Sequence, residues 1–304
     1  MEPNLKVSLG KLKLANPVLA ASGTFGYGFE LKKLIDVNKL GGIITKTITS
    51  LPKIGNEPPR VCELYAGMLN SIGLENVGVE RFIKEKLPEL NSLKTSIIVS
   101  IAGDEPDEFA VLAEKLSGQK GIDALELNLS CPNIYDQNRV YCDDKESVKT
   151  TIEKVKQKTL LPLIVKLSSN ASNFFELAKS CEEQKVDALT VANTYIGMAV
   201  NVKTKKPKLP FVTAGYSGPA IKPLTLRYVW LLKKKLDTAI VASGGIMNLQ
   251  DALEYFITGA TAVSLGTVNF INPNASSQIL EELKRYMKQE KINKMEELIG
   301  SLIC

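Results

Sequence analysis

The stretch SIIVSIAGDEPDEFAVLAEKLSGQKGIDALELNLS, residues 96–130, decides the fold class. It begins and ends with a short, mostly apolar run of strand length, SIIVSIA (96–102) and ALELNLS (124–130). Between these runs, residues 106–117 carry apolar side chains at helical spacing. A strand, a helix and a second strand in this order indicate two parallel strands joined by a helical crossover.

The same alternation continues along the rest of the chain. Six further strand-like runs are PVLAAS (17–22), GIITKT (42–47), LIVKLS (163–168), ALTVANT (188–194), AIVASGG (239–245) and AVSLGT (262–267). Helical patterns cover residues 76–87, 145–158, 173–184, 224–235, 248–258 and 275–288. Eight such units in about 250 residues predict a (β/α)8 TIM barrel, and we expect residues 1–304 to form a single domain. A doubly wound open sheet is the rival fold, but the chain has no G-x-G-x-x-G turn.

Segments outside this alternation predict how the ends of the barrel are built. Residues 5–15 predict a short N-terminal β-hairpin that closes the bottom of the barrel. Two long segments, 48–75 and 195–223, each follow a predicted strand. Because barrel sites are built from loops at the carboxyl ends of strands, we expect both to be inserted loops at the C-terminal face, forming a lid or rim.

The composition excludes several classes of protein. The 38 basic and 33 acidic residues give a net charge of only +5, which is too small to predict nucleic-acid binding. The five cysteines form no C-x-x-C pair, so we expect no metal site and no disulfide, and reduced thiols favour the cytoplasm. No apolar run has the length of a membrane span. Because the chain has no histidine, any proton transfer must use Cys, Asp, Glu, Lys or Tyr.

Polar residues at the ends of the predicted strands mark a candidate site. Barrel strands are covered on both faces and should be almost wholly apolar. Yet alternation turns Lys46, Asn128 and Lys166 toward the barrel interior, and Cys131 follows just past the end of its strand. An unpaired buried lysine or amide costs a few kcal/mol, so several of them together predict a binding site for a ligand with negative charge.

Glycines and asparagines indicate what the ligand contains. SGGI (243–246) and SLGT (264–267) end the seventh and eighth strands, where barrels frequently bind phosphate, although tight packing of helix on strand also uses glycine. Asparagine offers both a donor and an acceptor, so several together can read the edge of a pyrimidine-like ring, although each alone can cap a turn. The asparagines in question are Asn70, Asn128, Asn133 and Asn193.

The chain resembles the dihydroorotate dehydrogenase family nearly end to end, from LANPVLAASGTFGYG (14–28) to AVSLGTVNFINP (262–273). The specific motifs are MLNSIGLENVG (68–78), ELNLSCPN (126–133), VKLSSN (165–170), TVANTYIG (190–197) and GYSGPAIKP (215–223). The residues of the first and last of these motifs, 68–78 and 215–223, are similar to those of the class 1B branch. The resemblance implies an FMN enzyme that oxidises (S)-dihydroorotate to orotate in de novo pyrimidine synthesis. It also implies a homodimer core within a heterotetramer, whose second subunit carries FAD and a 2Fe-2S cluster and passes electrons to NAD.

The resemblance also implies roles for individual residues. Cys131 is the expected base at C5 of dihydroorotate, and a thiol has a pKa near enough to neutrality for that task. Lys46 is expected between flavin and substrate, and Lys166 beside the flavin ring, where it stabilises negative charge. The expected substrate-binding residues are Lys46, Asn70, Ile72, Gly73, Leu74, Asn128, Asn133, Asn193 and Thr194. The expected FMN-binding residues are Ala21, Ser22, Gly23, Lys46, Thr47, Ser100, Asn128, Lys166, Val191, Gly218, Gly244, Gly245, Gly266 and Thr267.

The sequence departs from the family pattern at two places and leaves other functions open. Ser100 stands where relatives commonly have an amide, and residues 134–144 lack the glycines usual in relatives, which weakens the idea of a closing lid. One alternative is a class 1A, fumarate-linked dihydroorotate dehydrogenase. A second is an FMN reductase similar to tRNA-dihydrouridine synthase, which the modest charge disfavours. A third is a barrel without redox chemistry.

Overall fold

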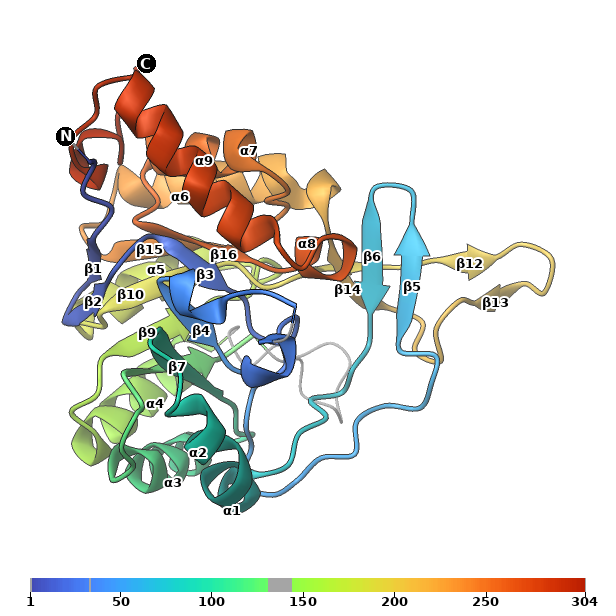
Figure 1. Ribbon diagram of the computed structural model, residues 1–304. Helices are drawn as coiled ribbons and strands as arrows, with labels where there is room; N and C mark the ends of the chain where they lie inside the picture. The colour runs from blue at the N-terminus through green and yellow to red at the C-terminus, as the bar shows by residue number, and fades with distance from the viewer. Residues whose placement is uncertain (1, 33, 131–143, 304) are drawn as a thin grey trace.

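The structure, a computed structural model, describes residues 2–32, 34–130 and 144–303 (Figure 1). Eight strands form a closed barrel in which all neighbours are parallel. In sheet order they are β10 (Ala188–Val191), β15 (Ala239–Ala242), β16 (Ala262–Leu265), β3 (Val18–Ala20), β4 (Gly42–Ile44), β7 (Ser96–Ile101), β8 (Ala124–Asn128) and β9 (Leu163–Lys166). Each predicted run contains one of these strands, so the predicted TIM barrel is confirmed.

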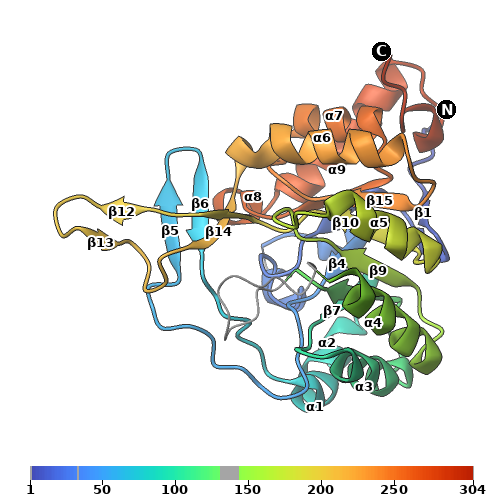
Figure 2. The same cartoon turned by 180° about the vertical axis from the view of Figure 1, so that it is seen from behind.

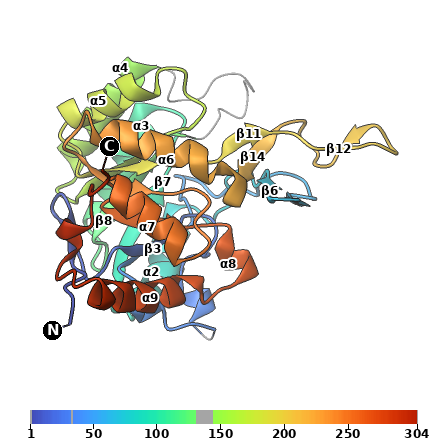
Figure 3. The same cartoon turned by 90° about the horizontal axis from the view of Figure 1, so that it is seen from above.

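Helices surround the barrel, as Figure 3 shows from above. They are α3 (Pro106–Ser117), α4 (Lys145–Lys158), α5 (Phe174–Glu183), α6 (Lys222–Lys233), α7 (Leu249–Thr258), α8 (Val268–Ile271) and α9 (Ala275–Gln289). Local sequence sets several of their starts. Asp144 and Asn248 cap α4 and α7 by accepting backbone N–H groups, and Pro106 occupies the first turn of α3, where its missing N–H is not needed. No helix among the described residues is long and apolar enough to cross a membrane.

The predicted helix at 76–87 is replaced by three consecutive short pieces. They are α1 (Val79–Arg81), the π-helical turn η3 (Phe82–Lys86) and α2 (Leu87–Leu90). Pro88 lies in the first turn of α2 and has no N–H to donate, so the regular ladder of hydrogen bonds is interrupted there. The shorter turns of the chain are η1 (Phe29–Leu31), η2 (Val37–Lys39), η5 (Pro219–Ile221) and η6 (Met295–Glu297).

The N-terminal hairpin is present where the sequence predicts it. Strands β1 (Val7–Leu9) and β2 (Leu12–Leu14) pair antiparallel, and Leu9 and Leu14 are buried. Gly10 takes a φ of 57° in the turn between them, a conformation that suits glycine. In Figures 1 and 2 the hairpin lies at the end of the barrel opposite to β5 and β6.

The two long segments form a second sheet rather than irregular loops. Strands β5 (Val61–Leu64) and β6 (Gly67–Asn70) come from the first segment, and β11 (Tyr195–Gly197) and β14 (Ala214–Ser217) come from the second. They join as one antiparallel sheet in the order β11-β14-β6-β5, with Gly215 opposite Asn70. The small hairpin of β12 (Val200–Asn201) and β13 (Lys206–Pro207) projects beyond this sheet (Figures 1 and 2).

Candidate active site

A pocket of about 410 Å³ opens at the carboxyl ends of the barrel strands. Seven of the eight strands contribute a lining residue at or just after that end: Ala21, Lys46, Asn128, Lys166, Asn193, Ser243 and Gly266. The small sheet supplies more of the wall, through Met68 and Asn70 of β6 and Gly215 and Ser217 of β14. The second sheet therefore completes the site that the barrel begins.

Thr47 is the centre of a hydroxyl and amide network at the pocket wall. Its Oγ1 lies 3.2 Å from Ser22 Oγ and 3.0 Å from Ser100 Oγ, and it accepts a hydrogen bond of 3.2 Å from Asn128 Nδ2. Thr47 and Asn128 are buried. The ends of four strands, β3, β4, β7 and β8, are thereby tied together through one side chain.

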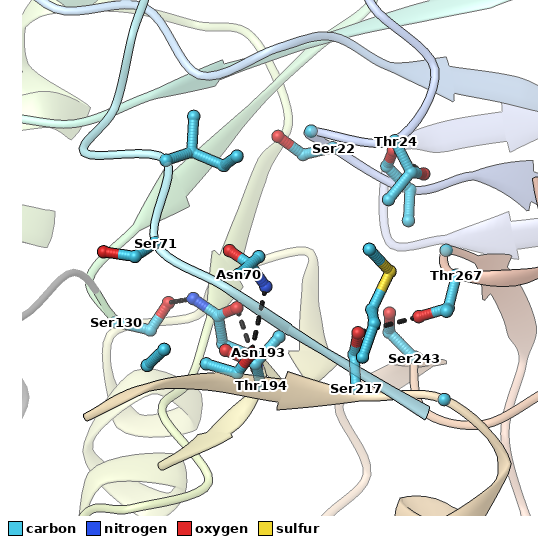
Figure 4. A pocket seen from close by; sticks show the side chains of 18 of the residues that line it. Ser22, Thr24, Asn70, Ser71, Ser130, Asn193, Thr194, Ser217, Ser243 and Thr267 are labelled. Atoms are coloured by element: carbon cyan, nitrogen blue, oxygen red, sulfur yellow. Dashed lines mark hydrogen bonds between the residues drawn. The ribbon is translucent and has the colours of Figure 1, made fainter. Parts of the chain in front are cut away.

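The network continues to the amides on one side of the pocket. Ser130 Oγ donates to Asn128 Oδ1 at 2.6 Å, and Asn193 Nδ2 donates in turn to Ser130 Oγ. The Thr194 N–H donates to Asn193 Oδ1 at 2.8 Å, which fixes the orientation of that amide. In Figure 4, Asn70, Ser130, Asn193 and Thr194 lie on the same side of the pocket. These groups form a set of donors and acceptors suited to a planar polar ring.

Lys46 takes part in a chain of charges at the pocket. Its Nζ lies 3.8 Å from Glu75 Oε2, and the same oxygen accepts from Arg60 Nη1 at 2.8 Å. Lys46 and Glu75 both line the pocket, and Glu75 is about half exposed. Glu75 therefore stands between two cations at the place where an anionic ligand would meet Lys46.

Lys166 is a buried residue whose ammonium group contacts no counter-charge in the part of the chain that the structure describes. Its residue is 7% exposed, it lines the pocket, and it makes no ion pair or hydrogen bond with the described residues. An ammonium group held in this way is costly unless a ligand compensates it. Lys166 is therefore the strongest sign in the pocket of a bound group with negative charge.

Bare glycine backbone forms another part of the wall. A Cβ added at Gly23 would meet nothing within 4 Å, and one added at Gly266 would meet only Ala21 and Thr24, each at 3.8 Å. Both glycines line the pocket. Nearby, Thr267 Oγ1 donates to Ser217 Oγ at 2.8 Å, and Figure 4 shows this pair with Ser243 on the side away from the amides. A ligand can approach the backbone closely here.

Two side chains have raised pKa values. Tyr195 contacts Thr225, and Lys222 contacts acidic side chains of α7. Burial raises the pKa of Tyr195, whose hydroxyl lies 3.4 Å from Thr225 Oγ1. Burial opposes the charge on Lys222, but the hydrogen bonds that its Nζ donates to Asp251 and Glu254 outweigh this effect and hold the pKa of Lys222 above 10.5. Lys222 therefore stays charged.

Among the described residues, no group of three or more His, Cys, Asp or Glu side chains could hold a metal.

The comparisons with known proteins agree with this geometry. The sequence profile of the dihydroorotate dehydrogenase family matches residues 4–287. The chain belongs to the dihydroorotate dehydrogenase family. It is 46% identical over 299 residues to the protein named dihydroorotate dehydrogenase B (NAD(+)), catalytic subunit, of Caldicellulosiruptor bescii, which covers 98% of this chain and 99% of that one. Proteins of the same name from Geotalea uraniireducens and Thermodesulfovibrio yellowstonii are 44% and 43% identical, over 99% and 98% of this chain and 99% of each relative.

Most residues expected from the dihydroorotate dehydrogenase resemblance line this one pocket. The lining residues among them are Ala21, Ser22, Gly23, Lys46, Thr47, Asn70, Ile72, Gly73, Leu74, Asn128, Lys166, Asn193, Thr194, Gly218, Gly244, Gly245, Gly266 and Thr267. Ser100 and Val191 do not line it. The Ser100 hydroxyl is hydrogen-bonded to the Thr47 hydroxyl, and Val191 is fully buried within β10. Cys131, Asn133 and residues 134–143 lie outside the described residues.

Other lining residues of this family member were missed from the sequence. Glu75, Asn170 and Ser217 line the pocket. Asn170 holds the turn after β10, because its Nδ2 donates to the Thr194 carbonyl at 3.0 Å and its Oδ1 accepts from the Ile196 N–H at 2.8 Å. Asn170 lies in the quoted motif VKLSSN, which could have marked it. Ser217 reaches the pocket at the end of β14 in the second sheet, and Glu75 lies on the segment that leads from β6 to α1.

Proposed function

We propose that this chain oxidises (S)-dihydroorotate to orotate in de novo pyrimidine synthesis and holds FMN as its cofactor. The observation that carries the proposal is Lys166, a buried residue without a counter-charge among the described residues, in a pocket whose wall includes both fixed amides and bare glycines. Membership of the dihydroorotate dehydrogenase family supports the choice of this substrate and of a flavin cofactor. We propose that residues 1–304 form one catalytic domain.

The residues of the pocket fit a flavin with a phosphate group. Gly23 and Gly266 leave the wall open where a side chain would project, and Gly218, Gly244, Gly245 and Thr267 would supply backbone and hydroxyl groups to a phosphate. Apolar side chains of Ile221, Met247 and Val268 line the same pocket. When bound, FMN supplies the acceptor for the hydride that leaves C6 of the substrate.

The amides and lysines would orient and polarise the substrate. Asn70, Asn128 and Asn193 present donors and acceptors for the carbonyl and N–H groups of the ring, and the hydrogen bonds that fix Asn128 and Asn193 lower the entropy lost on binding. Lys46 would bind the substrate carboxylate, exchanging its contact with Glu75 for one with the ligand. Lys166 would stabilise the negative charge that develops during the reaction, because its ammonium group is held at the pocket wall before the reaction begins.

Cys131 would remove the proton from C5. This role comes from the sequence and from the family resemblance, since Cys131 lies outside the described residues. Ser130, the residue before it, lines the pocket and bonds to both Asn128 and Asn193. The backbone that leads to the thiol is thus anchored beside the amides expected to hold the substrate.

The names of the relatives support a second subunit for electron transfer. They are called catalytic subunits of an NAD(+) enzyme. We propose that this chain, as a homodimer within a heterotetramer, passes electrons to a subunit with FAD and a 2Fe-2S cluster, which then reduces NAD.

The test measures orotate formed from dihydroorotate by the purified chain, first with a dye as electron acceptor and then with NAD. The proposal predicts rapid formation with the dye and little with NAD. A chain that forms no orotate with any acceptor would overturn the function. Efficient reduction of NAD without a partner would overturn only the division between subunits, and fumarate as the preferred acceptor would favour the class 1A alternative.

A further inference from the structure

The turn that follows β15 is fastened to the core by one face of α7. Tyr255 and Asp251 are four residues apart on this helix and therefore lie on the same side of it. The Tyr255 hydroxyl donates to the Gly244 carbonyl at 2.6 Å. Asp251 Oδ2 accepts from the Met247 N–H at 2.9 Å. The Gly244–Met247 turn is thus held at both of its ends.

The hydrogen bond from the Tyr255 hydroxyl fixes the orientation of the peptide group between Gly244 and Gly245. Tyr255 is fully buried and does not line the pocket, so the Gly244 carbonyl points into the core. The peptide bond between Gly244 and Gly245 is trans, and in a trans peptide the C=O and N–H groups point in opposite directions. The Gly245 N–H therefore points away from Tyr255, and Gly245 itself lines the pocket.

The Gly245 N–H is also free to bind a ligand. It donates to no acceptor among the described residues, and Gly245 is partly exposed at the pocket, where a ligand can reach this N–H. Gly245 has a φ of 69°, and a Cβ there would lie 2.9 Å from both the Gly218 carbonyl oxygen and the Lys222 nitrogen, so only glycine fits without movement. The peptide is held in one orientation with its donor unused.

Lys222 reinforces this arrangement. Its Nζ bonds to Asp251 Oδ1 at 2.7 Å and to Glu254 Oε1 at 2.9 Å, and its carbonyl accepts a second, longer contact of 3.3 Å from the Tyr255 hydroxyl. Asp251 is thus oriented for its bond to the turn. The ends of α6 and α7 act together behind the glycines.

We propose that Tyr255 is a positioning residue for an anion-binding peptide: by holding the Gly244 carbonyl in the core, it presents the Gly245 N–H to the phosphate of the ligand. This inference rests on the proposed function for the identity of that ligand as FMN. In this inference Tyr255 touches no ligand itself and affects only the contact between the protein and the phosphate.

The test compares FMN with riboflavin, which has the same ring system without the phosphate. Both are titrated into flavin-free protein by fluorescence, for the parent, Tyr255→Phe and the control Tyr286→Phe on α9. Phenylalanine keeps the ring and removes only the hydroxyl. Losing one buried hydrogen bond of this kind predicts FMN binding weakened about fivefold to tenfold, with riboflavin binding unchanged. Tyr286→Phe should behave as the parent, and thermal unfolding of each variant checks that the fold is retained.

Two results would overturn the inference. One is an unchanged ratio of FMN to riboflavin affinity in Tyr255→Phe, including the case in which both flavins are weakened equally. The other is a parent protein that binds riboflavin as tightly as FMN. Oxidation of dihydroorotate, measured on the same FMN-loaded samples, tests the proposed function separately, because the parent can keep its preference for FMN and still fail to oxidise this substrate.

Discussion

Replacing Lys166 by methionine should separate stability from activity. Methionine keeps most of the apolar stem and removes the charge. Lys166 is 7% exposed and has no ion pair or hydrogen bond with the described residues, so no contact among them in the flavin-free protein depends on its charge. We therefore expect the free energy of unfolding of the flavin-free variant to be unchanged or about 1 kcal/mol higher, which corresponds to about 2 °C in Tm.

The same change should impair the reaction strongly. Removing one preorganised charge that faces developing negative charge commonly lowers a rate by about 10²–10³. Stopped-flow reduction of the flavin by dihydroorotate without oxygen measures this step, and thermal unfolding of the flavin-free protein measures stability. The matched control is Lys222→Met. Lys222 is paired with Asp251 and Glu254, so its loss should destabilise the protein by about 1–2 kcal/mol.

Two results would refute this reasoning. A fall in stability of more than about 2 kcal/mol in Lys166→Met would mean that the ammonium has a stabilising counter-charge. The buried Glu126 would then be the candidate, because Thr190 bonds to only one of its oxygens, at 2.8 Å, and the other has no hydrogen-bond partner among the described residues. An unchanged rate of flavin reduction would refute the electrostatic role.

Three further predictions concern other parts of the molecule. Cys131→Ser should retain FMN but slow flavin reduction by dihydroorotate by orders of magnitude near neutral pH, because serine is a far poorer base; equal rates would exclude Cys131 as the base. Glu75→Gln should tighten orotate binding a few-fold in a low-salt titration, because it removes the carboxylate 3.8 Å from Lys46, whereas weaker binding would show that Glu75 holds Lys46 in place. Burial raises the pKa of Tyr255 above 10.0, so its contribution to stability is complete below pH 10.0 and is lost as the pH rises further. The free energy of unfolding, measured from pH 8 to 11, should therefore fall less steeply in Tyr255→Phe than in the parent. Parallel curves for the two proteins would contradict this.

The barrel could be predicted because its signals are local. Each strand is a short apolar run, and helices such as α3 and α4 follow from periodicity and capping within the same segment. The second sheet could not be predicted in this way. Strands β6 and β14 are separated by more than 140 residues, and Gly215 opposite Asn70 is a pairing that neither segment encodes alone.

The candidate site was predicted in part, for the same reason: local patterns are readable from the sequence and distant contacts are not. Alternation along β8 and β9 was enough to turn Asn128 and Lys166 into the barrel interior, and both line the pocket. Glu75 was missed because its contact with Lys46 depends on the folded path of residues 48–75. The expected contact of Ser100 with the flavin stays a prediction: its hydroxyl lies 3.0 Å from Thr47 Oγ1, and its fully buried side chain does not line the pocket.

The most direct test of the account is the visible spectrum of the purified protein before and after dihydroorotate is added in the absence of oxygen. A pocket that joins a flavin to this substrate predicts a yellow protein whose absorbance bleaches within the mixing time or soon after. A colourless protein that takes up no FMN, or a yellow one whose spectrum dihydroorotate leaves unchanged, would contradict the account.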